Sequence, residues 1–205
     1  MTEIRIYAEG GGDRKDTKAT IRRGFGSFFS ELRDDASRRR VRWRIVAMGP
    51  RNAAFEGWQM ARDSHPDAVN VLLVDAEEAV TSEAWEHLHI RDGWPLKSVD
   101  GDCCHLMVQV MESWLIADAD ALARYYGQGF QRSALPANNN VEQVDKAQVS
   151  SALGRATRRT QKGEYHKIRH GGELLGLVDA ATVRRKAPSC ERLFATLRDV
   201  IAKAV

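Results

Sequence analysis

The chain has 205 residues, 43% of them apolar, which is enough for one hydrophobic core with a smaller helical appendage. No apolar stretch approaches the ~18 residues of a membrane span and the N-terminal residues lack a signal-peptide pattern, so we expect a cytoplasmic protein without a membrane segment. The formal net charge is only +3, and three cysteines, two of them adjacent, fit neither a disulfide framework nor a CxxC metal site.

The first half of the chain alternates strand-like and helix-like segments. A short strand is expected at residues 4–8, and apolar residues at helical spacing predict a helix over 17–34. In the following segment, "VRWRIVAMG", Arg42 and Arg44 alternate with apolar residues. This pattern is typical of a half-buried strand near the edge of a sheet.

The next elements complete a parallel sheet. We expect a helix at about 53–62, and the apolar run 69–74 indicates a central strand covered on both faces. Strand and helix alternating in this order predict a parallel α/β sheet. An irregular region follows, and then a strand at 105–110 and one helix from about Trp114 to Tyr126.

The C-terminal part of the chain has a helical pattern. Residues 127–140, with "GQGF" and "PANNN", read as a linker, and Ser189 is a candidate cap for a last helix over 189–205. We therefore expect an α/β domain at 1–127 and a helical C-terminal extension at 128–205 packed on it. A single domain is the alternative.

Two acids close the first and third expected strands. Glu9 ends the first strand and Asp75 the third, and in doubly wound sheets these strands are commonly neighbours whose carboxyl ends border the ligand site. Residues two apart in an extended segment share a face, so Asp75 and Glu77 are expected to point toward Glu9, with Glu78 turned away. The sequence therefore predicts three carboxylates in one crevice.

Carboxylates that crowd together repel one another, and a divalent cation removes the conflict. Oxygen ligands favour Mg²⁺ or Mn²⁺, which bind substrate phosphates, whereas the lack of paired His and Cys argues against zinc. The other interpretation is that Glu9 is an ordinary strand-end residue and Asp75 caps the next helix. Glu77 and Glu78 then favour the positive end of that helix.

Basic residues lie near these acids in the sequence. The glycines at 10–12 let backbone N–H groups approach a phosphate, with Arg14 and Lys15 close by, but "GGGDRK" is neither GxGxxG nor a Walker A loop. The segment "KGEYHKIRHG" places cations and imidazoles around Tyr165, either as phosphate-binding groups or as a solvated basic turn. Its candidate phosphate-binding residues are Lys162, His166, Lys167 and His170.

Several segments together carry a family resemblance. "YAEGGGDRK", "VLLVDAE", "HLMVQVMESWLIAD", "YYGQGF" and "YHKIRHGGELLGLVD" look like the uncharacterised Toprim-like domain-of-unknown-function family 4276, related to RloB-like proteins and to Toprim nucleases of the overcoming-lysogenization-defect type. The resemblance implies a Toprim-like, Rossmann-like fold in which Glu9, Asp75 and Glu77 bind metal. Glu112 is then a fourth ligand or a general base, unless it only begins the next helix. Toprim sites often have Asp where this chain has Glu77.

The resemblance also implies a function. It suggests a Mg²⁺-dependent nuclease that hydrolyses phosphodiester bonds of nucleic acid, accompanied by an ATPase partner in prokaryotic defence against phage. Whether it acts as a monomer or a homodimer is open. Two other functions remain open. One is a non-catalytic interaction module that docks an ATPase or nucleic acid, and the other is a nucleotide-binding regulator using the glycine turn.

Overall fold

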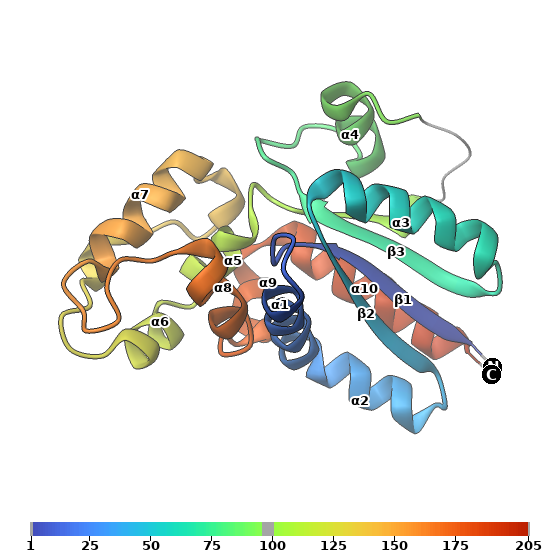
Figure 1. Ribbon diagram of the computed structural model, residues 1–205, viewed down its shortest axis with the longest axis horizontal. Helices are drawn as coiled ribbons and strands as arrows, with labels where there is room; N and C mark the ends of the chain where they lie inside the picture. Colours follow the sequence, from blue (N-terminus) through green and yellow to red (C-terminus); the bar gives the residue numbers. More distant parts are fainter. Residues whose placement is uncertain (1, 96–100, 205) are drawn as a thin grey trace.

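A computed structural model describes residues 2–95 and 101–204 of the chain. Its sheet contains four parallel strands in the order β2-β1-β3-β4 (Figure 1). The strands are β1 (Glu3–Glu9), β2 (Arg42–Gly49), β3 (Ala68–Asp75) and β4 (Cys104–Met107). This arrangement confirms the predicted α/β class, places β1 beside β3, and puts the arginine-rich β2 at an edge.

Helices cover both faces of the sheet. In β1, Ile4, Ile6 and Ala8 pack into one core cluster and Tyr7 into another, so the strand is buried on both sides, as expected for a parallel sheet. The first face is covered by α1 (Lys15–Phe28), α2 (Ser30–Arg38) and the last helix, α10 (Pro188–Lys203). The second is covered by α3 (Arg51–Ser64) and α4 (Ala84–Asp92).

Five further helices gather beyond the carboxyl ends of the strands, at the left of Figure 1. They are α5 (Met111–Ala117), α6 (Ala119–Tyr126), α7 (Lys146–Thr157), α8 (Lys167–Leu175) and α9 (Ala180–Lys186). Their apolar side chains belong to the same core cluster as the first face of the sheet, and Trp114 stacks on Phe28 with 5.0 Å between ring centroids. The helical part therefore closes the end of the sheet at which Glu9 and Asp75 lie.

Two expected helices are each interrupted once. The segment predicted as one helix over 17–34 forms α1 and α2, separated at Phe29, whose ring stays buried and stacks on Phe25. The helix expected from Trp114 to Tyr126 breaks at Asp118. There the carboxylate accepts the Ala121 N–H at 3.0 Å, because the side chain caps α6 instead of continuing α5.

Other boundaries also differ from the prediction. The region expected to be irregular contains α4, while its residues 96–100 lie outside the described part of the chain. The fourth strand ends at Met107, before the predicted residue 110. Ser189 does not cap α10, because Pro188 already occupies the first turn and the Ser189 N–H binds Glu142 at 2.7 Å.

Glycines fix two close contacts that shape the site. The loop 10–12 has positive φ at every residue, and a Cβ on Gly49 would lie 2.3 Å from the Gly12 carbonyl oxygen. In α1, a Cβ on Gly24 would lie 2.3 Å from the carbonyl oxygen of Gly172 in α8. These contacts hold the glycine loop beside β2 and bring α8 directly against α1.

Candidate metal centre

Three carboxylates converge at the carboxyl ends of β1 and β3. Glu9, Asp75 and Glu77 each offer a ligand atom, and these atoms all lie within 4.8 Å of one another. Asp75 is almost fully buried, whereas Glu9 and Glu77 are partly exposed. The predicted group therefore forms, and the exposed Glu78 is outside it. A cluster of this composition suits a hard cation that prefers oxygen ligands.

Asp75 is held from two sides. Its Oδ1 accepts the N–H of Met111, the first residue of α5, at 2.7 Å, and its Oδ2 accepts a hydrogen bond from Lys167 at 3.0 Å. Burial raises the pKa of Asp75, and the charge of Glu112 raises it further, against the lowering effect of Lys167. The carboxylate is thus fixed in orientation and strongly dependent on neighbouring cations.

Glu9 is positioned by Arg51, the first residue of α3. The Oε2 atom of Glu9 accepts the Asp75 backbone N–H at 3.0 Å and lies 3.4 Å from Nη1 of Arg51. The same Nη1 also donates to the backbone carbonyl of Asp75. Arg51 forms a two-pronged pair with Asp92 at 3.0 and 2.7 Å and stacks over Trp94. Burial, and then repulsion from Asp75, raise the pKa of Glu9 to about 7.

Glu77 reaches the group by an unexpected route. The strand ends at Asp75, and Glu77 takes a left-handed backbone conformation with φ 71°, its N–H donating to the Gln109 carbonyl at 2.6 Å. Such a conformation is uncommon for a long side chain and costs about 1 kcal/mol or more. Burial acts to raise the pKa of Glu77, but the hydrogen bond from Lys146 at 2.9 Å and its charge outweigh this and lower it.

Glu112 lies next to the three-carboxylate group but is not part of it. Its Oε1 accepts the Tyr165 hydroxyl at 2.9 Å, and its Oε2 is 3.5 Å from Lys167 Nζ. The Lys167 ammonium therefore stands between Glu112 and Asp75. Burial acts to lower the pKa of Lys167, but the charges of these two carboxylates outweigh this and raise it, so the ammonium stays protonated.

The charges of the site do not balance. Asp92 pairs with both Arg51 and Arg91, so the site holds four cations, these two arginines with Lys146 and Lys167, against five carboxylates: Asp92, Glu9, Asp75, Glu77 and Glu112. Burial first, and then repulsion from Asp75, raise the pKa of Glu9, and a divalent cation would compensate the excess negative charge. The site opens into a cavity of about 520 Å³. Its lining residues are Glu77, Val110, Glu112, Lys146, Ala147, Ser150, Tyr165, His166 and Lys167.

The predicted phosphate-binding residues separate into different places. Lys167 and His166 line the acidic cavity, whereas the ammonium of Lys162 lies 4.6 Å from the ring centre of Tyr125. His170 is buried, and its Nδ1 accepts the His166 N–H at 3.1 Å and lies 3.1 Å from the Tyr126 hydroxyl. The ring of His170 is therefore turned into the protein. Arg14 and Lys15 lie at the start of α1, where Arg14 pairs with Asp16.

Three residues of the site were not among the sequence candidates. Arg51 follows β2 directly, so the rule that parallel strands end at one edge could have placed it near Glu9. Asp92 and Lys146 come from α4 and α7, and no local pattern in the sequence links them to the acids.

None of the described helices is long and apolar enough to span a membrane. A family model described as "Domain of unknown function (DUF4276)" matches residues 8–198, a range that contains all of the acids discussed above. Comparison with curated proteins and with solved structures finds no match.

Proposed function

This chain belongs to the DUF4276 family, a domain of unknown function, and from its acidic site we propose that it hydrolyses phosphodiester bonds of nucleic acid with Mg²⁺ or Mn²⁺. The observation that carries the proposal is the meeting of Glu9, Asp75 and Glu77 in a site whose carboxylates outnumber its cations by one. The resemblance to Toprim nucleases supports it. An ATPase partner and a role in defence against phage, which that resemblance also implies, stay predictions.

Each residue of the site would have a separate role in such a reaction. Glu9, Asp75 and Glu77 would hold the metal, which when bound polarises the phosphodiester and stabilises developing charge. Lys167 and Lys146 border the cavity and neutralise phosphate oxygens. Glu112, oriented by Tyr165, accepts the proton of the attacking water as the new P–O bond forms and the bond to the leaving oxygen breaks. Solvent protonates the leaving oxygen.

Asp75→Asn tests this proposal most directly. It removes the central charged ligand while keeping the shape of the side chain, and we expect Mn²⁺ affinity, measured by calorimetry, to fall at least about 10- to 100-fold. Metal-dependent cleavage of DNA or RNA should disappear with it. Glu78→Gln is the matched control, because this exposed neighbour lies outside the group and should leave both readouts unchanged. Cleavage that persists in Asp75→Asn would contradict the proposal.

One observation favours a second candidate. Each acid already has a cationic protein partner, in Arg51, Lys146 or Lys167, which is the arrangement that a structural cluster in a non-catalytic interaction module requires. If this second candidate is correct, calorimetric titration of the wild-type protein with Mn²⁺ detects no binding that is lost in Asp75→Asn. The two candidates therefore differ in a measurement that needs neither substrate nor partner.

A further inference from the structure

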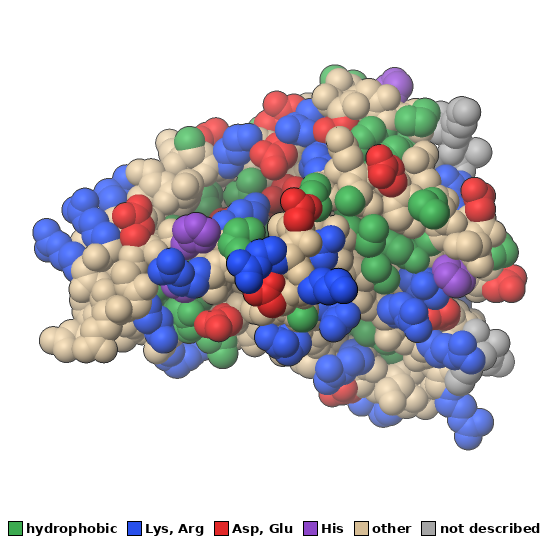
Figure 2. Space-filling model, in the orientation of Figure 1, with side chains coloured by type: hydrophobic (Ala, Val, Ile, Leu, Met, Phe, Trp, Pro, Cys, Tyr) green, Lys and Arg blue, Asp and Glu red, His purple; other side chains and the backbone are tan. Residues whose placement is uncertain are grey.

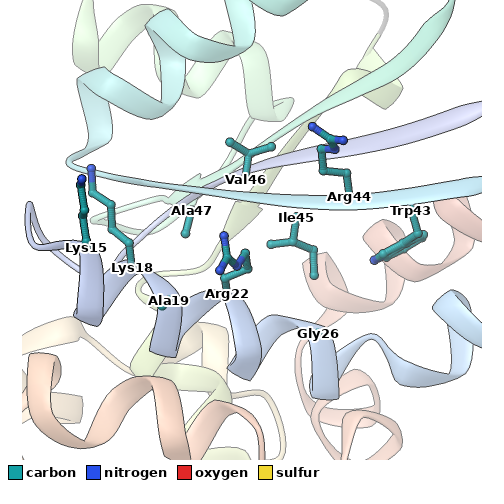
Figure 3. A pocket seen from close by; sticks show the side chains of 10 residues that line it. All are labelled: Lys15, Lys18, Ala19, Arg22, Gly26, Trp43, Arg44, Ile45, Val46 and Ala47. Carbon is teal, nitrogen blue, oxygen red and sulfur yellow. The ribbon is translucent and has the colours of Figure 1, made fainter.

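A basic groove lies outside the acidic site, between α1 and the edge strand β2 (Figure 3). Its volume is about 730 Å³. In Figure 3, Lys15, Lys18 and Arg22 extend from α1 toward β2, and Ile45 and Ala47 point from β2 toward the helix. The groove therefore has a cationic wall and an apolar floor.

The cations of this wall are not neutralised by the protein. Lys15, Lys18 and Arg22 form no ion pair with any described residue, and Arg44 at the rim has only a 3.7 Å contact with Glu3 while remaining 60% exposed. Figure 2 shows basic side chains gathered over α1, α2 and β2 on this face. Unpaired cations in a concave surface concentrate a field that attracts polyanions.

The spacing of the wall fits a chain of phosphates. Positions 15, 18 and 22 share one face of α1 and span about 10 Å along its axis. Lys15 opens the helix, where the helix dipole also favours an anion. Anionic groups repeated along a flexible strand match three cations in a row better than a single small anion does.

The groove ends next to the acidic site. The Lys18 side chain lies against Gly49, 2.8 Å from where a Cβ would stand, and Gly49 pairs with Glu9 and Gly10 at the carboxyl end of β1. A strand bound along α1 is thereby directed toward the three carboxylates. This continuity connects the groove to the substrate of the proposed reaction.

We propose that the groove between α1 and β2 binds the backbone of single-stranded nucleic acid and leads it to the acidic site. This inference rests on the proposed function for its direction, but the binding itself does not depend on catalysis. The groove lies between one helix and one strand, a shape that suits a single strand of nucleic acid laid along α1. The apolar floor, with Trp43 at one end, contacts the bases.

An acidic peptide added to the free edge of β2 is the competing occupant. The structure favours nucleic acid because Arg42 and Arg44 are exposed on this strand, and charged side chains on an edge discourage pairing with another strand. The groove also meets the acidic site, which strand addition does not explain.

The test measures binding of short labelled pyrimidine oligonucleotides, DNA and RNA, by fluorescence anisotropy in EDTA. The groove variant carries both Lys18→Gln and Arg22→Gln. The matched control carries both Arg158→Gln and Arg159→Gln, which replace two exposed cations that follow α7 and lie outside the groove. We expect the groove variant to bind about tenfold more weakly at low salt. Its slope of log K against log salt should be smaller by about 1.4, for two lost phosphate contacts. Thermal unfolding checks that both variants are folded.

Equal losses in both variants, or no loss in either, would overturn the inference. It would also be overturned by an acidic peptide that binds as tightly as the oligonucleotide and loses its affinity in the same variant. Unchanged binding in the groove variant, alongside cleavage that Asp75→Asn abolishes, removes the groove and leaves the proposed function standing. Weakened binding in the groove variant, with no metal-dependent cleavage by the wild-type protein, supports the groove and removes the proposed function.

Discussion

The acidic site and the basic groove carry opposite charges, and these charges differ in burial and in how they are paired. Asp75, Glu9 and Glu112 are buried or nearly so, and each is bound by named partners at 2.7–3.5 Å. Lys15 and Arg22 of the groove are exposed and unpaired among the described residues. Buried, coupled charges make large and mutually dependent contributions, whereas exposed ones contribute little and nearly additively. Substitutions should therefore separate the two regions by size of effect and by response to salt.

The largest effect on stability is expected at Arg51. Arg51→Met leaves Glu9 without its arginine and Asp92 with Arg91 alone, and loss of one member of a buried pair costs about 3 kcal/mol or more. The free energy of unfolding from urea titration measures this. The control is Arg62→Met on the same helix, which loses only a contact over the Trp58 ring and should cost less than about 1 kcal/mol. Similar losses at both positions would remove the contrast between buried and exposed charge.

Glu9→Gln should change how stability depends on pH. The pKa of Glu9 is about 7 in the folded protein, against an ordinary 4.5, so between these values the folded state holds a proton that the unfolded chain has released. The contribution of this group to stability is therefore complete below about pH 4.5 and is lost as the pH rises through about 7. At about pH 8 the metal-free variant should be more stable than wild type by up to roughly 3 kcal/mol.

Mg²⁺ should reverse that order. It stabilises the wild-type protein by binding the folded state, and it should stabilise Glu9→Gln less. Unfolding temperatures measured across pH, with and without Mg²⁺, give both comparisons. A wild-type protein whose stability is flat between about pH 4.5 and 7 would show that the charged form of Glu9 does not destabilise the fold.

Lys146→Ala tests an intermediate case, a half-exposed lysine on a site carboxylate. The pair with Glu77 has 47% and 26% exposed side chains, so its loss should cost less than about 1 kcal/mol of stability. Removing the cation leaves more negative charge, and Mn²⁺ should bind about threefold more tightly. The KM for nucleic acid should rise at the same time, because a phosphate contact is lost. Metal affinity and KM that fall together would contradict this role.

The smallest effect is expected in the groove. Arg22→Gln should leave the free energy of unfolding within about 0.5 kcal/mol of wild type, since the side chain is exposed and makes no ion pair with a described residue. For oligonucleotide binding, the slope of log K against log salt should become smaller by about 0.7, for one lost phosphate contact. A change in stability larger than that of Lys146→Ala would show that the groove is structural.

The meeting of the acids was predictable because it depends on few, local facts. Glu9 and Asp75 close neighbouring parallel strands, and such strands end at the same edge of a sheet. Glu77 was placed correctly for an incomplete reason, since its left-handed backbone is set by the hydrogen bond to Gln109 and not by an extended strand.

The cations of the site were harder to foresee. Lys167 is in a segment whose basic character is visible, but its approach to Asp75 depends on how closely α8 packs against α1, which the facing Gly24 and Gly172 decide. Lys146 lies beyond the linker on α7, and its contact with Glu77 depends on how the helical part closes the sheet. Tertiary packing of this kind leaves no periodic signal in the sequence.

Two sides of helix α1 face different parts of the molecule. One side carries Lys18 and Arg22 into the groove, and the other meets α8 at Gly24 so closely that no methyl group fits between them. Since α8 begins with Lys167, whatever shifts α1 along β2 also shifts the ammonium that lies between Asp75 and Glu112. A ligand in the proposed groove that displaced α1 would therefore also change the acidic site, because Gly24 and Ile21 of α1 both pack closely on Gly172 of α8.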